Sequence, residues 1–325
     1  MSDILEVKNL NIGFKKDNKI QNYTDGVTFS IKQGEILCLV GESGCGKTIT
    51  ALSLMGLLPA NAVITSGEIN FGGINLLGIK EKQLNNIRGN EIAMVFQDAM
   101  NSFNPCFTIG NQIVETIRKH LNYDKKKARQ YAIELLKQVG IKNYREVYHM
   151  YPHTLSGGMK QRAMIAMAIA CKPKLLIADE PTTALDVTIQ LQIMELLTRL
   201  SKENNMAILL ITHDMGVVAE IADRVIVMYA GQCMEENDVY SIFDNPKHPY
   251  TRALLKSVPS VQNGKNVRLT SIDGVVPENY MELTGCRFAG RCPYAASQCK
   301  ENIPYEHHVR CIKTQNLREE TVHGK

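Results

Sequence analysis

The sequence lacks the features of a protein that crosses a membrane or enters the secretory pathway. Its first residues, MSDILEVKNL, have neither the basic start nor the apolar stretch of a secretory signal. No run in the chain approaches the ~20 apolar residues that a membrane-spanning helix needs. We therefore expect a protein of the cytosol, either free or docked on a larger assembly.

Neither sign of charge dominates the chain. The 37 Lys and Arg residues stand against 33 Asp and Glu residues, a net charge of +4, which is too balanced to indicate a nucleic-acid-binding surface. The sequence also contains no internal repeat and no low-complexity tract. Since 325 residues exceed one ordinary domain, we expect one large domain with an appendage, or two domains.

Five short apolar runs predict the strands of a buried sheet. They are EILCLV at 35–40, IAMVF at 92–96, LLIAD at 175–179, AILLIT at 207–212 and RVIVMY at 224–229. Strands that are apolar along nearly their whole length are typical of a mainly parallel sheet covered on both faces, and therefore of an α/β fold. Between Phe96 and Leu175 the pattern becomes helical, as in TIGNQIVETIRKHL and YDKKKARQYAIELLKQVG. This stretch predicts a helical insertion.

A glycine-rich loop follows the first of these runs. Residues 41–48, GESGCGKT, have the spacing of a phosphate-binding loop, and a helical segment comes next. The strand–loop–helix context that this motif requires is therefore present. The predicted nucleotide-binding residues are Gly41, Glu42, Ser43, Gly44, Cys45, Gly46, Lys47 and Thr48.

Each part of this loop has an expected role. Backbone N–H groups and the helix N-terminus would face the phosphates, Lys47 would reach the β- and γ-phosphates, and Thr48 would offer its hydroxyl to Mg²⁺. The same helix N-terminus would lower the pKa of the Cys45 thiol and make it reactive. The loop therefore predicts binding of a nucleoside triphosphate such as ATP.

Polar side chains at the ends of other predicted strands indicate hydrolysis. Asp179 would hold Mg²⁺, mostly through water, and Glu180 beside it would act as the general base that activates the attacking water. Gln97 is placed to sense the metal or the water, and His213 to hydrogen-bond the γ-phosphate, because ligands gather at the carboxyl edge of such sheets. A structural role for His213 is the alternative.

The segment LSGGMKQR at 155–162 separates this chain from the many other proteins with a phosphate loop. Together with that loop, VFQD, LLIADE, TALD at 183–186 and ITHD, in this order, it resembles the ATP-binding-cassette ATPases across roughly the first 250 residues. The resemblance implies a P-loop NTPase core of the RecA-like type, with an antiparallel β subdomain and a helical insertion at about 98–165. It also implies a pair of subunits.

Several residues take their roles from this resemblance. Ser156, Gly157 and Gly158 would open a helix whose N-terminus closes over the ATP held by the other subunit. Asp186 would contact the opposing subunit and couple the two sites. Phe14 would stack on adenine, with a core phenylalanine as the alternative. Met159 stands where glutamine is commoner in the family.

Two further stretches resemble the cassettes that drive oligopeptide, dipeptide and nickel import in bacteria. They are NSFNPCFTIG at 101–110 and NPKHPYTRALLKSVP at 245–259. The resemblance implies a peripheral protein at the cytoplasmic face of the cell membrane, with a second ATPase subunit as its partner in a heterodimer. Two membrane-spanning permease subunits and an extracytoplasmic peptide-binding protein complete the implied assembly, and no nucleic acid takes part. An ATPase of a nickel or metal-chelate importer and a soluble cassette protein without a transport role are the alternatives.

Four cysteines lie near the C-terminal end, with the spacing C-x5-C-x6-C-x11-C. Clustered thiols in the cytosol are more often metal ligands than disulfides, but the close cysteine pairs of structural zinc sites are absent from this spacing. Four thiolates are the ligand set of a [4Fe–4S] cluster, and the tails of the peptide-importer ATPases carry a similar pattern. The predicted iron–sulfur ligands are Cys286, Cys292, Cys299 and Cys311.

Other interpretations of these cysteines stay open. Zinc and reduced thiols without a metal are the alternatives. His307 and His308 would allow a mixed cysteine–histidine zinc site, and exposed loop positions without ligation are the alternative for them. We place a domain boundary before this region, with a cassette at 1–257 and a cysteine-rich C-terminal extension at 258–325. The extension has few large apolar residues, so a metal would act as its structural staple rather than as a redox sensor. The residues expected to offset thiolate charge are Arg287, Arg291 and Arg310.

Overall fold

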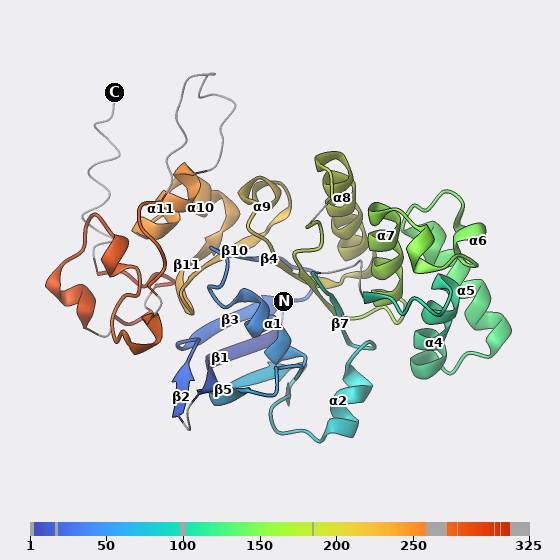
Figure 1. Ribbon diagram of the computed structural model, residues 1–325, viewed down its shortest axis with the longest axis horizontal. Helices are drawn as coiled ribbons and strands as arrows, with labels where there is room; N and C mark the ends of the chain where they lie inside the picture. The colour runs from blue at the N-terminus through green and yellow to red at the C-terminus, as the bar shows by residue number, and fades with distance from the viewer. Residues whose placement is uncertain are drawn as a thin grey trace. The chain divides into compact units, whose positions relative to one another are not determined.

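Parallel strands are present in both of the units into which the chain divides (Figure 1). The computed structural model describes residues 3–16, 19–97, 102–183, 185–257, 272–277, 279–301, 303–305 and 307–312. The first unit contains Met1–Leu5, Ile31–Ile36 and Phe71–Ile211, and the second contains Glu6–Ser30, Leu37–Asn70 and Thr212–Lys325. Each unit is therefore assembled from stretches that are separate in the sequence.

Three parallel strands run through the first unit. β8 (Leu175–Asp179) pairs on one side with β7 (Ile92–Val95) and on the other with β9 (Ala207–Ile211). Leu175 lies opposite both Ile92 and Ala207. Every residue of the three strands is buried, so the strands predicted from apolar runs are confirmed.

Helices make up most of the remainder of the first unit. They are α2 (Glu81–Ile87), α4 (Ile109–Leu121), α5 (Lys125–Gln138), α6 (Tyr144–Val147), α7 (Gly157–Ala168) and α8 (Val187–Asn204), with a 3-10 turn at Pro152–Thr154 and a short strand β6 (Ile74–Asn75). α4, α5 and α7 pack against one another (Figure 1). Thr108 caps α4 and Asp124 caps α5 by accepting a backbone N–H of the first turn. The predicted helical pattern is confirmed in this region.

The second unit contains two groups of strands. In one group, β1 (Asp3–Lys16) pairs antiparallel with β2 (Lys19–Asn22) and also pairs with β3 (Val27–Lys32) and β5 (Ala62–Phe71). In the other, β10 (Arg224–Tyr229) runs parallel to β4 (Ile36–Val40) and antiparallel to β11 (Gln232–Asp238). The helices are α1 (Lys47–Leu54), α9 (Met215–Ile221), α10 (Val239–Asp244) and α11 (Pro249–Lys256).

The cysteine-rich segment, residues 279–312, follows in the second unit. Its described part contains three 3-10 turns, at Tyr280–Glu282, Ala289–Arg291 and Ser297–Lys300. It joins the edge of β11 through a bridge between Val309 and Glu235, and the backbone N–H of Arg310 donates to the carbonyl oxygen of Met234 at 2.9 Å. The segment is therefore attached to the strand that follows β10.

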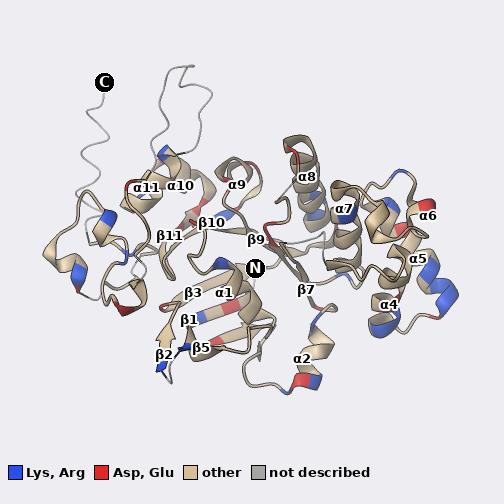
Figure 2. Cartoon of the chain, in the orientation of Figure 1, with Lys and Arg blue, Asp and Glu red and all other residues tan. Residues whose placement is uncertain are grey.

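Charges of both signs are interspersed in each unit (Figure 2), as the net charge of +4 suggests. Of the helices within the described ranges, none is long and apolar enough to span a bilayer.

Candidate functional site

The phosphate loop lies between β4 and α1 in the second unit. Gly41 has a φ of 148°, and a Cβ atom there would lie 2.0 Å from the carbonyl oxygen of Met228. Only glycine fits this close approach of the loop to β10. Ser43, Gly44 and Thr48 are exposed. They form the face of the loop that a nucleotide can reach.

The side chain of Lys47 is buried and folded over this loop. Its Nζ donates to the carbonyl oxygens of Gly41 at 2.8 Å and Glu42 at 3.0 Å, and lies 3.6 Å from the sulfur of Cys45. Neutral carbonyl groups do not cancel the charge of an ammonium group. The loop therefore carries a localised positive charge, as phosphate binding requires.

The expectation that Cys45 is reactive was wrong. Cys45 is only 2% exposed. Burial raises the pKa of its thiol, and the charge of Lys47 offsets only part of this rise. Because the thiolate is the nucleophile, a buried and protonated thiol reacts poorly. The predicted lowering of the pKa by the helix N-terminus is outweighed by burial, because the side chain of Cys45 points into the protein.

Phe14 is connected to the phosphate loop through Tyr23. The half-buried ring of Phe14 lies 5.4 Å from that of Tyr23, edge to face. The hydroxyl of Tyr23 donates to the carbonyl oxygen of Gly44 in the loop. Phe14 is thus a partly exposed aromatic near the loop, whereas a core phenylalanine would be fully covered. His213 is exposed in the turn before α9, whose first N–H groups are capped by Asp214.

Asp179 and Glu180 lie at the carboxyl end of β8 in the first unit. Asp179 is 2% exposed. Glu180 has a φ of 44°, a left-handed conformation that costs a residue with a side chain about 1 kcal/mol or more and is commonest at functional sites. Its Oε2 accepts hydrogen bonds from Nε2 of Gln97 and from Oγ1 of Thr183, both at 2.9 Å. Gln97 and Glu180, predicted separately, are brought together, and Thr183 is a partner that the sequence did not reveal.

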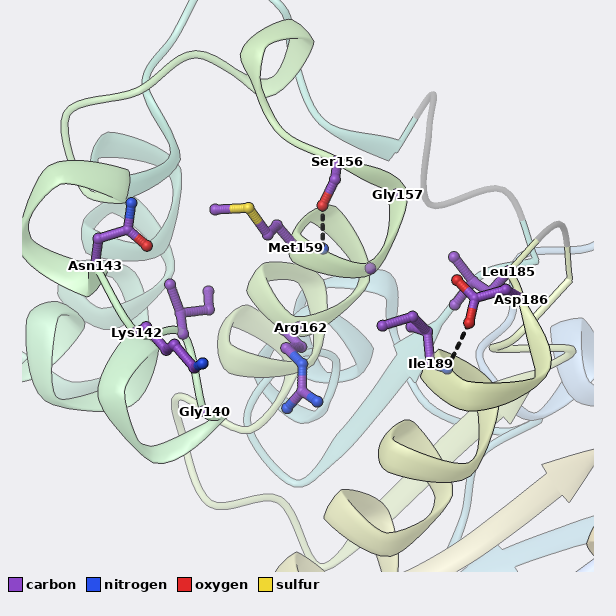
Figure 3. Close-up of a pocket in the computed structure, with 12 residues that line it drawn as sticks. Gly140, Lys142, Asn143, Ser156, Gly157, Met159, Arg162, Leu185, Asp186 and Ile189 are labelled. Atoms are coloured by element: carbon purple, nitrogen blue, oxygen red, sulfur yellow. Dashed lines mark hydrogen bonds between the residues drawn. The ribbon is translucent and has the colours of Figure 1, made fainter.

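A cavity of about 490 Å³ lies between the starts of α7 and α8 in the first unit (Figure 3). Ser156 caps α7 and Asp186 caps α8, each through its side-chain oxygen. Gly157 and Gly158 also line the cavity, and a Cβ atom on Gly158 would lie 2.9 Å from the side chain of Ile189. Two helix N-termini therefore border one cavity, an arrangement that favours an anionic group.

Among the residues of this cavity that sequence reasoning missed, three are polar, namely Lys142, Asn143 and Arg162. The guanidinium of Arg162 donates to the carbonyl oxygen of Val139 and, at 3.0 Å, to Gln192. Arg162 ends the quoted segment LSGGMKQR, so a signal for it existed. Lys142 and Asn143 come from the connection between α5 and α6, where no motif marks them.

The four C-terminal cysteines line one small cavity in the second unit. Burial is the main cause that raises the pKa of Cys286 to about 11, and the thiols of Cys299, Cys292 and Cys311 raise it further. The four thiols therefore lie near enough to influence one another. Within the described parts of the chain, however, no group of three or more His, Cys, Asp or Glu side chains has the geometry of a metal site.

Other predicted residues of this region face different groups. His308 is 69% exposed at its side chain and lies 3.5 Å from Glu236, while the buried His248, which sequence reasoning missed, lines the cysteine cavity. Arg310 also lines it. Arg287 donates instead to the carbonyl oxygen of Ala230 in the turn between β10 and β11. His248 belongs to the quoted stretch NPKHPY, which was its only signal.

Two family models match the chain. The model described as "ABC transporter" matches residues 24–183, and the model described as "Oligopeptide/dipeptide transporter, C-terminal region" matches residues 234–299. The first match includes the phosphate loop and Glu180. The second includes α11 and three of the four C-terminal cysteines.

Curated relatives are similar over almost the whole chain. The dipeptide transport ATP-binding protein DppD of Escherichia coli (strain K12) is 50% identical over 301 residues, which cover 93% of this chain and 92% of that protein. The oligopeptide transport ATP-binding protein AppD of Bacillus subtilis (strain 168) is 51% identical over 305 residues, which cover 94% and 93%. A solved ATP-binding cassette, dimeric in a post-hydrolysis state with ADP and Pi, matches with a TM-score of 0.64 and 28% identity over 72% of this chain and 98% of its own.

Proposed function

Because the chain belongs to the family of ATP-binding subunits of oligopeptide and dipeptide ABC transporters, we propose that it is the ATPase that drives a bacterial importer of dipeptides or oligopeptides. The observation that carries this proposal is the match of residues 234–299 to the C-terminal region of peptide transporters. A cassette from outside the group of oligopeptide, dipeptide and nickel importers would need only the first match. The cargo class therefore rests on the C-terminal region.

In this function the phosphate loop and Phe14 contribute the groups that contact ATP itself. Lys47 pairs with the β- and γ-phosphates, the backbone of the exposed loop face holds them, and Phe14 stacks on adenine. Thr48 and Asp179 would hold Mg²⁺, which neutralises charge on the phosphates when it is bound. The localised charge of Lys47 and the exposure of Thr48 support this assignment.

Glu180 acts as the general base of hydrolysis. Its carboxylate takes a proton from the attacking water as the oxygen of that water approaches the γ-phosphorus. The amide of Gln97 and the hydroxyl of Thr183 both bind Oε2, so they hold the carboxylate in one orientation. His213 would hydrogen-bond the γ-phosphate.

Pairing of two subunits completes the ATP sites. Ser156, Gly157 and Gly158 of one subunit would face the ATP bound by the other, with Asp186 coupling the two sites, and hydrolysis would reopen the pair. The cavity between two helix N-termini supports this role, since it suits an anionic group. The partners would be a second ATPase subunit, two permease subunits and an extracytoplasmic peptide-binding protein. The chain would lie peripherally at the cytoplasmic face of the membrane.

The cysteine-rich segment would hold a [4Fe–4S] cluster through Cys286, Cys292, Cys299 and Cys311. The identity and number of the donors support this proposal, since four thiols line one cavity, although in the described residues they do not have the geometry of a metal site. The cluster would supply four sulfur–iron bonds that tie the segment together, as a staple of the extension at 258–325 that follows a cassette at 1–257. Zinc and metal-free thiols are the other outcomes of a metal assay.

The transport function is tested in proteoliposomes that contain this chain, its partner ATPase and the permease subunits of the same organism. We expect ATP hydrolysis to rise, and labelled dipeptide to accumulate, when the binding protein and dipeptide are supplied on the opposite side. Uptake of nickel or a nickel chelate without dipeptide uptake would replace the peptide assignment with a metal one. Hydrolysis that no permease influences would contradict a transport role.

A further inference from the structure

The cysteine-rich segment contacts the phosphate loop directly through Arg291. Its Nη1 donates to Oε2 of Glu42 at 2.7 Å and its Nη2 donates to Oε1 at 3.1 Å, so guanidinium and carboxylate form a two-pronged ion pair. Glu42 is the second residue of the loop GESGCGKT. Paired hydrogen bonds of this kind fix the relative orientation of both groups as well as their distance.

Arg291 is held so completely that it can act as a fixed support. Its remaining N–H groups donate to Tyr229 at 3.3 Å, to the carbonyl oxygen of Asp273 at 2.9 Å and to that of Ile272 at 3.1 Å. A guanidinium has five N–H donors, and all five are used. The side chain is 6% exposed, against 27% for Glu42. Screening by solvent is therefore weaker than at a surface ion pair.

A second contact holds the backbone of the same loop residue. The N–H of Glu42 donates to the hydroxyl of Tyr250 at 3.0 Å. The ring of Tyr250 packs against Phe288 of the cysteine-rich segment at 5.3 Å and against Tyr229 at 4.7 Å. These three rings are at most 1% exposed. Both the side chain and the backbone of Glu42 are thus held by groups that pack with the C-terminal segment.

Glu42 places a negatively charged side chain in a loop that binds an anion, and a free carboxylate there would be unfavourable for binding. Free, its carboxylate would repel the phosphates of ATP, because it belongs to the loop that holds them. Paired with Arg291, the carboxylate is neutralised and is directed away from that role. The ion pair also anchors the start of the loop while its exposed face, which includes Ser43 and Gly44, is left for the nucleotide.

We propose that Arg291 is a positioning residue for ATP binding: it neutralises and orients Glu42, and thereby makes the C-terminal segment part of the machinery that sets the affinity of the phosphate loop for ATP. Arg291 directly precedes Cys292, so whatever holds the four cysteines also sets the place of this arginine. The inference rests on the ATPase function, and it does not depend on which metal the cysteines hold.

The experiment compares variants of the full-length chain, assembled with its partner subunits, by the KM for Mg-ATP and by kcat. Arg291→Gln removes both the charge and the paired hydrogen bonds of the guanidinium, whereas Arg291→Lys keeps the charge alone. Arg310→Gln is the matched control. Arg310 is also buried, also precedes a cysteine and belongs to the same segment, but it donates to the carbonyl oxygens of Ile303 and Cys233. Thermal unfolding of each variant measures the general loss of stability.

We expect Arg291→Gln to raise the KM for ATP about tenfold while kcat falls less than twofold. Arg291→Lys should recover part of this loss, and Arg310→Gln should lower the unfolding temperature without raising the KM. In Glu42→Gln the carboxylate charge is gone, so adding Arg291→Gln should cost little further affinity, because the two residues act as one pair.

Two results would overturn the inference. One is an unchanged KM in Arg291→Gln, and the other is an equal rise of KM in Arg291→Gln and Arg310→Gln, which would show a structural role alone. Wild-type protein that does not hydrolyse ATP would refute the proposed function instead, so the two failures are distinguishable.

Discussion

The ATP-binding motifs and the cysteine-rich segment are held in place by different means. The phosphate loop lies between a fully buried strand and a helix, and Glu180 follows another fully buried strand. The cysteine-rich segment has short 3-10 turns, and its buried residues include two arginines, Arg287 and Arg310. Regular backbone hydrogen bonds support the first region, whereas individual side chains support the second.

This difference has consequences for how each region responds to substitution. In the motifs, the backbone should survive loss of a functional side chain, so that chemistry is lost while the fold is kept. In the cysteine-rich segment, each buried polar side chain stabilises the local structure, so its loss should lower the stability of the segment. Substitutions in the motifs should therefore remove function without lowering stability, whereas most substitutions in the cysteine-rich segment should lower stability.

The largest effect is expected from Glu180→Gln, which removes the general base but keeps the shape of the side chain. We expect steady-state ATP hydrolysis to fall about 1000-fold, with ATP binding retained. Turnover and nucleotide binding by the assembled ATPase are the measurements. Glu91→Gln is the control, since Glu91 forms an exposed ion pair with Lys174 at 2.8 Å and should change turnover less than about twofold. Near-normal turnover in Glu180→Gln would contradict the role of this carboxylate.

Loss of one of the four predicted cysteine ligands should unfold the cysteine-rich segment locally. Anaerobically purified protein is expected to contain about four irons and four sulfides per chain, and Cys292→Ser should lose most of them. By analogy with the loss of a native disulfide crosslink, we expect the free energy of local unfolding of this segment to fall by about 3 kcal/mol. Protease should then cleave the segment about 100-fold faster.

The exposed Cys106 provides the control for this substitution. Cys106→Ser should change neither metal content nor proteolysis. One zinc per chain, or no metal, in the wild-type protein would refute the iron–sulfur prediction.

Lys47→Ala tests whether the ATP-binding motifs can lose ATP affinity while the protein keeps its fold. Removing the ammonium group deletes charge-assisted bonds to phosphate, and we expect the affinity for ATP to fall about 100-fold. Titration with a fluorescent ATP analogue measures it, alongside circular dichroism to confirm the fold. Lys8→Ala, at an exposed ion pair with Glu6, should bind ATP normally. Tight binding by Lys47→Ala would count against the phosphate-loop assignment.

A smaller effect is expected from pH, acting through His248. Burial is the main cause that lowers the pKa of His248 from 6.5 to about 3. Between these values the unfolded chain binds a proton that the folded protein does not, so the free energy of unfolding falls as the pH is lowered from about 6.5 toward 3. At pH 5 the loss should reach about 2 kcal/mol relative to pH 7.

Denaturant unfolding at the two pH values measures this dependence. His248→Gln should flatten it, whereas His307→Asn, at an exposed position, should leave it unchanged. An identical pH slope in wild type and His248→Gln would show that other groups cause the acid sensitivity.

The elements that carry the fold were largely predictable from local patterns. The run RVIVMY at 224–229 coincides with β10, and AILLIT at 207–212 extends β9 by one residue. Such runs are reliable because burial on both faces requires an apolar residue at nearly every position. Thr183 as a partner of Glu180, Lys142 at the cavity between the starts of α7 and α8 and the buried thiol of Cys45 could not be predicted, because each depends on which side chains pack around it.

The sequence alone determined the chemistry that depends on residues close together in the chain. A loop of eight residues, GESGCGKT, specifies its own backbone turn and its lysine, because strand, loop and helix are joined by local geometry. Only the tertiary structure decided which distant residues contact that loop. Arg291 and Glu42 are 249 residues apart in the sequence, and neither motif predicts an ion pair with the other. Their pairing follows from the packing of the cysteine-rich segment against β10, β11 and α11, and packing is a property of the folded chain.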